Sequence, residues 1–225
     1  MNYSIKSMTK LAASILMIVL LTQKAHSQKN HISISVNSLS TSFDYGKANS
    51  TLRPYKKDFK GIQFGIACES GISPMFSIVK GLYFSAKGGI LNENNPYTVN
   101  KSTLKLYTLD VPLLARIHFN NFYVNAGPYV AYTLGGNMKS DGAESLPVES
   151  GKISFGNSAY DFNRWDFGAL AGVGYNFNMK KSILTLDVRY GYGFVNISNN
   201  IQRYNRSLSI SVLLSKPPRN SRKNG

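Results

Sequence analysis

The chain has 225 residues, of which 43% are hydrophobic and 12% aromatic, and its formal net charge is +15. This length suits one domain, and this apolar content excludes a disordered chain. The basic residues are scattered and do not form one stripe with stacking aromatics, which argues against a nucleic-acid-binding protein. For a surface protein of this charge, the expected counter-charge is anionic lipopolysaccharide.

Residues 1–27 have the pattern of a secretory signal peptide. Lys6 and Lys10 precede an apolar run over 11–21, and a small-x-small cleavage site follows at 25–27. Removing this segment leaves 23 basic and 11 acidic residues, a net charge of +12. No cysteine stands directly after the cleavage site, and no later stretch has the roughly 18 apolar residues of a membrane helix. We therefore expect an exported chain with neither a lipoprotein anchor nor a helical span.

Apolar and polar residues alternate with a period of two along most of the remaining chain, which predicts β-strands. The predicted strands are 31–43, 61–69, 76–90, 103–119, 122–134, 164–177, 183–194 and 205–215. Long polar loops are expected at 44–60, 92–102, 135–163 and 198–204, with short turns between the other strands. An even number of strands whose connections alternate long and short is typical of outer-membrane barrels.

The segment 164–194 shows which face of the sheet is outside. One set of alternate residues is wholly apolar or aromatic, and the other carries Asp, Arg and most of the glycines. A soluble lipocalin-like barrel would bury the apolar set, whereas a membrane barrel turns it outward. Three features favour the membrane version: glycine on the polar face, aromatics near the ends of the apolar set, and the export signal.

The sequence therefore predicts an all-β protein, an eight-stranded antiparallel up-and-down transmembrane β-barrel in the cell outer membrane. The barrel domain is expected over 28–215, with both termini in the periplasm and a basic periplasmic tail over 216–225. Outer-membrane lipid is then an expected partner, together with lipopolysaccharide.

Five charged residues fall on the polar set and are predicted to point into the lumen. They are Asp110, Arg116, Asp166, Asp187 and Arg189. Buried charges are costly unless they are paired, so these residues predict an internal ion-pair network with a structural role. The alternative is that the network gates the lumen or binds a ligand. Because side chains fill the interior of an eight-stranded barrel, general diffusion is not expected.

No enzyme is expected. Small outer-membrane barrels with enzymatic activity use a histidine near the external rim, whereas His26 belongs to the signal, His31 begins the mature chain and His118 lies at the periplasmic end of its strand. The glycine pairs at 172–174 and 191–193 lie within strands and precede no helix, so they are not phosphate loops. No Cys and His spacing predicts a metal site, no cofactor is expected, and the single cysteine, Cys68, excludes an internal disulfide.

Several motifs together carry a resemblance to a known family. They are Leu-Asp-Val-Pro-Leu-Leu-Ala-Arg at 109–116, Tyr-Val-Asn-Ala-Gly-Pro-Tyr-Val at 123–130, Asp-Phe-Gly at 166–168 with Gly-Val-Gly-Tyr at 172–175, and Leu-Asp-Val-Arg-Tyr-Gly-Tyr-Gly at 186–193. In this combination the chain resembles the PorT-like outer-membrane barrel family of Bacteroidetes. The resemblance implies an eight-stranded outer-membrane barrel and a part in protein export through the type IX secretion system. One departure is that the last strand ends at Leu213-Leu214-Ser215, without the usual terminal aromatic residue.

Two classes of function stay open. The first is a structural or accessory barrel that acts through secretion-machinery or other periplasmic proteins, or anchors the envelope by its basic tail. The second is a surface-binding or adhesion barrel whose external loops engage lipopolysaccharide or an external ligand. Deleting 216–225 should disturb the first, and replacing the loop 44–60 should disturb the second. We favour the first because of the resemblance.

Overall fold

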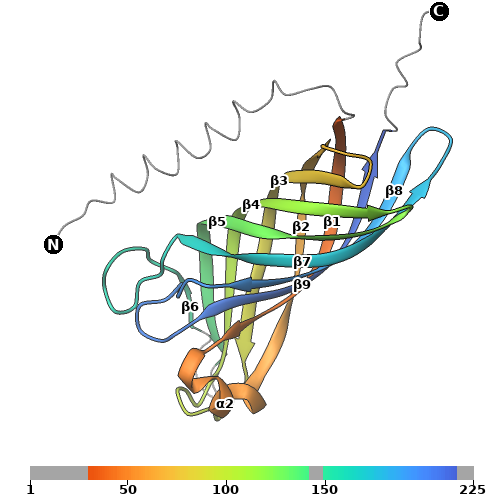
Figure 1. Cartoon of the computed structure of the whole chain (residues 1–225). Helices are drawn as coiled ribbons and strands as arrows, with labels where there is room; N and C mark the ends of the chain where they lie inside the picture. The colour runs from red at the N-terminus through yellow and green to blue at the C-terminus, as the bar shows by residue number, and fades with distance from the viewer. Residues whose placement is uncertain (1–29, 142–148, 217–225) are drawn as a thin grey trace, which may run out of the picture.

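The computed structural model describes residues 30–141 and 149–216, in which eight long antiparallel strands close into a barrel (Figure 1). The strands are β1 (Asn30–Asp44), β2 (Lys56–Gly71), β3 (Phe76–Leu91), β4 (Lys101–Phe119), β5 (Phe122–Asp141), β7 (Trp165–Asn178), β8 (Ile183–Gly193) and β9 (Tyr204–Ser215). Each long strand pairs with the next one along the chain, and β1 pairs with β9 to close the barrel. The predicted eight-stranded up-and-down architecture is confirmed.

The two ends of the barrel differ. We call the end with the short turns, where β1 begins and β9 ends, the turn end, and the end with the long connections the loop end (Figure 1). At the loop end, the connection after β1 folds into three short helices, η2 (Gly46–Ala48), α2 (Asn49–Leu52) and η3 (Arg53–Tyr55). No helix within residues 30–141 and 149–216 is long and apolar enough to cross a membrane.

Two predicted loops were partly wrong. The polar run that begins at Lys56 belongs to β2, and β5 continues to Asp141 and pairs with an additional short strand, β6 (Glu149–Lys152). Both extensions lie at the loop end. There a strand no longer faces an apolar surface, so its outward residues are polar and the alternation that identifies a strand disappears. The predicted signal peptide, 1–27, and all of the predicted tail 216–225 except Lys216 lie outside the described residues.

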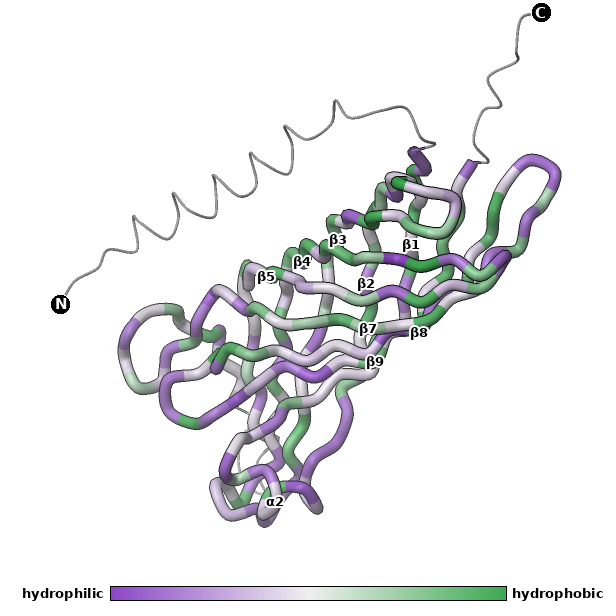
Figure 2. Tube along the Cα trace, viewed as in Figure 1, coloured by the Kyte–Doolittle hydropathy of each residue, from purple (hydrophilic) through white to green (hydrophobic). Residues whose placement is uncertain are grey.

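The alternation along each strand separates an apolar outside from a polar inside. On β1, Ile32, Ile34 and Val36 are 68%, 66% and 55% exposed, whereas Ser35 and Asn37 are 1% and 2% exposed. Figure 2 shows hydrophobic and hydrophilic residues succeeding one another along the strands. A barrel with this arrangement presents an apolar surface to its surroundings, as a membrane-spanning barrel does.

Aromatic side chains form two belts on the outside, one over β2 to β7 and one over β4 to β7. The loop-end girdle contains Phe64, Phe84, Tyr107, Tyr132, Trp165 and Phe167, which contact one another across neighbouring strands or along one strand. The turn-end girdle contains Phe119, Phe122, Tyr175 and Phe177. Twelve positions separate Tyr107 from Phe119 on β4, close to the roughly 9 to 11 residues with which a tilted strand crosses a bilayer. The belts therefore mark two membrane interfaces.

The position of Trp165 can be tested because it is the only tryptophan in the sequence. Trp165 is 40% exposed in the loop-end girdle, and indole rings favour the headgroup region. Its fluorescence in vesicles is expected to be quenched more by lipids brominated near the headgroup than by lipids brominated at the chain ends. Moving the tryptophan to mid-depth, with Trp165→Phe and Leu113→Trp together, should reverse that order. Equal quenching by both lipids in the natural sequence would contradict the belt.

The loop end of the barrel is closed by an apolar cluster that we call the loop plug. Its buried members come from strands and loops together: Phe43, Tyr45, Leu52, Leu91, Leu104, Leu106, Phe162 and Ile197. Leu52, on the helix α2, is fully buried among them. An ion pair between Asp44 and Arg206 joins β1 to β9 beside this cluster. The first loop is therefore folded over the barrel mouth.

Candidate functional site: the polar lumen

The interior of the barrel is built in layers. A small apolar layer lies between two polar ones and contains Ala67, Val79, Tyr83, Leu114 and Leu170. Strand β4 shows the order directly, because its inward row carries Asp110, then Leu114, then Arg116. We call the layer on the Arg116 side the turn-side layer and that on the Asp110 side the loop-side layer.

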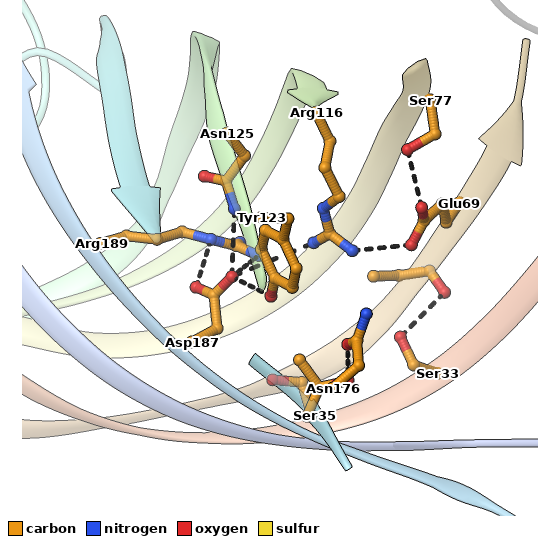
Figure 3. Close-up of polar contacts among 12 residues, drawn as sticks. Ser33, Ser35, Glu69, Ser77, Arg116, Tyr123, Asn125, Asn176, Asp187 and Arg189 are labelled. Atoms are coloured by element: carbon orange, nitrogen blue, oxygen red, sulfur yellow. Dashed lines mark hydrogen bonds and ion pairs between the residues drawn. The ribbon is translucent and has the colours of Figure 1, made fainter. Parts of the chain in front are cut away.

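Asp187 is at the centre of the turn-side layer (Figure 3). Its side chain is fully buried, and its Oδ2 accepts hydrogen bonds from Tyr123 Oη at 2.5 Å and Asn125 Nδ2 at 3.1 Å. Arg189 Nε lies 2.6 Å from Asp187 Oδ1, and Arg116 Nη2 lies 3.9 Å from Oδ2. One carboxylate thus joins β5, β8 and β4.

Arg116 links this centre to the turn end of the barrel. Its Nη1 donates to Glu69 Oε2 at 2.6 Å, and its guanidinium lies 3.7 Å from the centre of the Tyr123 ring. Arg116 is only 4% exposed, so it is a desolvated cation held by two carboxylates and one aromatic face. Pairs of this kind resist separation because the partner left behind would be a buried, uncompensated charge.

A group of three polar residues lies at the turn-end mouth. Glu69 Oε1 accepts from Ser77 Oγ at 2.7 Å and lies 2.8 Å from His118 Nε2, and Ser77 Oγ is 3.0 Å from the same Nε2. A Ser-His-acid relay requires the serine and the carboxylate on opposite ring nitrogens. Here both contact one nitrogen, and Ser77 is 2% exposed, so the geometry does not provide an activated nucleophile.

Asp110 organises the loop-side layer. It accepts hydrogen bonds from Ser85 Oγ at 2.5 Å, Thr108 Oγ1 at 2.8 Å and Gln63 Nε2 at 3.1 Å. Lys87 Nζ lies 3.1 Å from Asp110 Oδ1 and makes the ion pair of this layer. Four strand residues therefore converge on one carboxylate, with each of its oxygens occupied.

Asp166 lies in the same layer but is bound differently. Tyr129 Oη donates to its Oδ2 at 2.9 Å, and Asn205 Nδ2 donates to the same oxygen at 2.8 Å. No ion pair of Asp166 is present in the described part of the chain, although the residue is 2% exposed. Neutral donors, and not a cation, hold this buried carboxyl group.

The five residues that the sequence singled out are thus all inside the barrel. Arg116, Asp187 and Arg189 meet in the turn-side layer, whereas Asp110 and Asp166 lie in the loop-side layer. The partners that sequence reasoning missed include Glu69, Lys87, Tyr123 and Tyr129. The signal was present for these residues, since each occupies an inward position of its strand. Charge on the inward row would have found Glu69 and Lys87, but not the two tyrosines.

The interior leaves little open space. A cavity in the loop-side layer, lined in part by Gln63, Tyr83 and Asp110, has about 50 Å³, and one at the turn-end mouth has about 110 Å³. A cavity needs roughly 10 to 15 Å³ of this kind to hold one water molecule, so both cavities have room for several waters. With the apolar layer between the cavities and the loop plug above them, the lumen is a packed interior and not a channel.

Glycines on the inner face make room for the large polar side chains, and this leads to a prediction. A Cβ added at Gly174 would lie 2.2 Å from the Tyr123 ring, whereas one added at Gly151, on β6, would meet nothing within 4 Å. Gly174→Ala is expected to destabilise the barrel by about 1 to 3 kcal/mol, because the overpacked Tyr123 must move away from Asp187. Urea unfolding of the refolded protein measures the change, with Gly151→Ala as the matched control. Equal stability of the two variants would contradict this role for Gly174.

Metal binding is not supported by this arrangement. Within residues 30–141 and 149–216, no group of three His, Cys, Asp or Glu side chains could hold a metal ion.

The thiol of Cys68 is free and half-buried on β2.

Comparisons with known proteins give a family for this chain. A search of the curated proteins finds no match. Among solved structures, the chain is similar to Ail of Yersinia pestis, crystallised with the heparin analogue sucrose octasulfate (11% identity, TM-score 0.46, covering 85% of this chain and 99% of that chain). It is also similar to Neisserial surface protein A (12% identity, TM-score 0.44, covering 85% and 99%) and to OprG of Pseudomonas aeruginosa (12% identity, TM-score 0.38, covering 85% and 95%). A family model described as "Outer membrane protein beta-barrel domain" matches residues 27–199. The chain therefore belongs to this family of outer-membrane β-barrels.

Proposed function

We propose that this protein is a non-conducting barrel with a structural or accessory role that it performs by binding other proteins of the envelope. The packed lumen carries this proposal. Ion pairs around Asp110 and Asp187, the apolar layer between them and the loop plug leave no path for a solute. If no solute passes through the interior, the function of the barrel depends on what its outer surface and its loops bind.

The specific role that we propose is in protein export through a type IX-like secretion system. Its support is the resemblance of the motifs over 109–193 to the PorT-like family of Bacteroidetes. In this proposal the loop end faces outward and both termini lie in the periplasm, where the basic tail can meet partner proteins. That orientation is supported by the usual design of outer-membrane barrels, in which short turns are periplasmic and long loops are external. We also propose that the protein has no catalytic activity.

The test compares the secreted proteins of a strain lacking this gene with those of its parent. We expect type IX cargo to disappear from the medium and to accumulate in the periplasm. Re-expression of the full chain should restore export, and re-expression of a chain ending at Lys216 should not. Membrane fractionation checks that both versions reach the outer membrane. An unchanged secretome in the deletion strain would reject the secretion role.

A second candidate function is binding of lipopolysaccharide at the outer surface, and basic residues at the loop end favour it. Lys57, Lys60 and Lys152 are exposed on β2 and β6, at the loop end. Lys105 Nζ lies 4.9 Å from the centre of the Tyr107 ring in the loop-end girdle. These ammonium groups are at the depth at which the phosphates of an outer-leaflet glycolipid would lie.

This second function predicts that lipopolysaccharide stays bound during purification in mild detergent. The triple variant Lys60→Gln, Lys105→Gln and Lys152→Gln should retain markedly less of it, and added salt should have the same effect. The double variant Lys180→Gln and Lys181→Gln, in the turn between β7 and β8, is the control for lost charge. Equal retention by the two variants would remove this candidate.

A further inference from the structure

One cation lies on the lipid-facing surface between the two aromatic girdles. Lys80 is half-buried on β3, in an outward row that otherwise consists of Phe76, Ile78, Leu82 and Phe84. Its neighbours in the sheet are Cys68 on β2 and Leu113 on β4. Among the described residues, no other Lys or Arg occupies an outward position at this depth, since Lys87, Arg116 and Arg189 point inward.

Lys80 is close to the middle of the membrane-spanning band. Its neighbour Leu113 is six positions from Tyr107 in one girdle and six from Phe119 in the other. A lysine on the lipid face is most costly at this depth. Phe76 and Phe84, the aromatic ends of its own row, are each four positions from Lys80, about 13 Å along the strand. A lysine side chain that snorkels does not cover this distance.

The part of the chain that the structure describes does not supply an acid for Lys80. Of the acids in the described strands, four point into the lumen: Glu69, Asp110, Asp166 and Asp187. The others are at strand positions of the loop end: Asp44, Asp58, Asp141 and Glu149. In the described part of the chain, Lys80 has neither a hydrogen bond nor an ion pair through its side chain. The ammonium charge of Lys80 therefore requires a counter-charge from outside the barrel.

The strand pairing beside Lys80 is also interrupted. The pairing of β3 with β4 is interrupted at Gly81 and Leu82, opposite Pro112, and the pairing of β4 with β5 is interrupted at Leu113 and Leu114, opposite Pro128. A proline has no N–H to donate to a ladder. Unpaired backbone groups in lipid are costly, and here both interruptions flank the same lysine.

The side chains around these interruptions are small. Outward positions next to Leu113 are occupied by Ala115, Ala126 and Pro128, and beyond them on β7 by Ala169 and Ala171. Small residues allow a second membrane-spanning segment to approach the backbone closely. We call the surface formed by Lys80, Leu113, Ala115, Ala126 and Pro128 the β3–β5 face; the three strands lie side by side in Figure 1.

We infer that the β3–β5 face binds a membrane-spanning segment of a different protein, and that this segment carries an Asp or Glu side chain that pairs with Lys80. A second copy of this chain does not fit, because a symmetric contact would bring lysine to lysine and offers no acid at this depth. Lipid phosphates do not fit either, because they lie at the interfaces that the girdles mark. The inference rests on the proposal that the barrel acts through partners, but not on a role in secretion.

The test is site-specific photocrosslinking in the native outer membrane. A photoreactive amino acid at Leu113 should give one discrete adduct with another membrane protein, whereas the same amino acid at Val212 should not. Val212 is an outward residue of β9, which lies opposite β4 in the order of strands around the barrel. Lys80→Glu should lower the yield of the Leu113 adduct about tenfold or more, because a buried charge pair becomes a repulsion. Lys180→Glu, at the turn end, is the matched charge change and should leave the yield unaltered.

A charge swap decides whether Lys80 pairs with an acid. The crosslinked segment of the partner should contain a lipid-facing Asp or Glu, and its replacement with Lys should restore the adduct with the Lys80→Glu chain. Three results would overturn the inference: adducts with lipid alone, adducts between two copies of this chain, or a protein adduct whose yield ignores Lys80→Glu. The folded barrel is verified by its heat-modifiable electrophoretic mobility, and Lys80→Gln replaces Lys80→Glu if the latter does not insert. If the deletion strain secretes its proteins normally and the adduct still depends on the charge at Lys80, the secretion role is rejected and the binding of a partner segment at the β3–β5 face is retained.

Discussion

Asp187→Ala is expected to destabilise the barrel by about 3 to 5 kcal/mol, the range for removing one partner of a buried ion pair. Asp187 is fully buried and receives Tyr123 Oη and Asn125 Nδ2, while Arg189 Nε lies 2.6 Å from it. Without the carboxylate, Arg116 still has Glu69, but Arg189 is a buried guanidinium without a counter-charge. The measurement is urea-induced unfolding of the protein refolded into lipid vesicles.

Two further variants show whether charge, and not packing, causes that loss. Asp58→Asn removes an exposed carboxylate of β2 and is expected to change the unfolding free energy by less than about 1 kcal/mol. The double variant Asp187→Leu with Arg189→Met removes both charges of the pair and should recover much of the lost stability, because apolar replacements of a buried pair are often well tolerated. A loss for Asp187→Ala no larger than that for Asp58→Asn would contradict the role of Asp187 as the centre of the layer.

The strands could be predicted from the sequence because one rule, apolar outside and polar inside, holds wherever a strand crosses the apolar part of the membrane. The prediction was wrong where a strand extends beyond that part. Lys56 at the start of β2 and the residues of β5 beyond Leu134 stand above the girdle, so their outward neighbours are polar. A bulge adds to the difficulty: Tyr107 pairs with Gly135 and Thr108 with Thr133, so Leu134 is unpaired and the inward row changes parity after it. No local pattern in a single sequence marks such a change.

The contacts inside the lumen could be predicted only in part from the sequence. Alternation assigns an inward row to each strand, but it does not say which inward residues lie at the same height. Height depends on the stagger between neighbouring strands, which brings Glu69 to Arg116 and Asn125 to Asp187 across 47 and 62 positions of sequence. For the same reason Asp110 and Arg116, both on β4, serve different layers. Tyr123 and Tyr129 were missed because a tyrosine in a strand is equally expected in an aromatic girdle.

The loop plug carries the second large prediction. Leu52→Ala is expected to cost about 2 to 5 kcal/mol, the range for truncating a fully buried leucine. Leu52 is on a helix of only four residues, Asn49–Leu52, which is held by its contacts in the plug and not by its own hydrogen bonds. The variant should therefore destabilise mainly the first loop. The population of the opened loop should rise roughly 30-fold or more. Limited trypsin treatment of the folded protein measures this opening as faster cleavage at the exposed Lys47.

The barrel itself should survive the opening of its plug, because the strand ladders and both polar layers lie below the loop. The heat-modifiable mobility of Leu52→Ala is thus expected to match that of the natural protein while the first loop is cut. Val99→Ala is the matched control, since Val99 is 74% exposed on another loop and its truncation removes no packing. Cleavage of Leu52→Ala at the same rate as Val99→Ala would show that the plug does not depend on Leu52. Loss of the folded barrel together with the loop would show that the plug and the strands unfold as one unit, contrary to the layered interior described above.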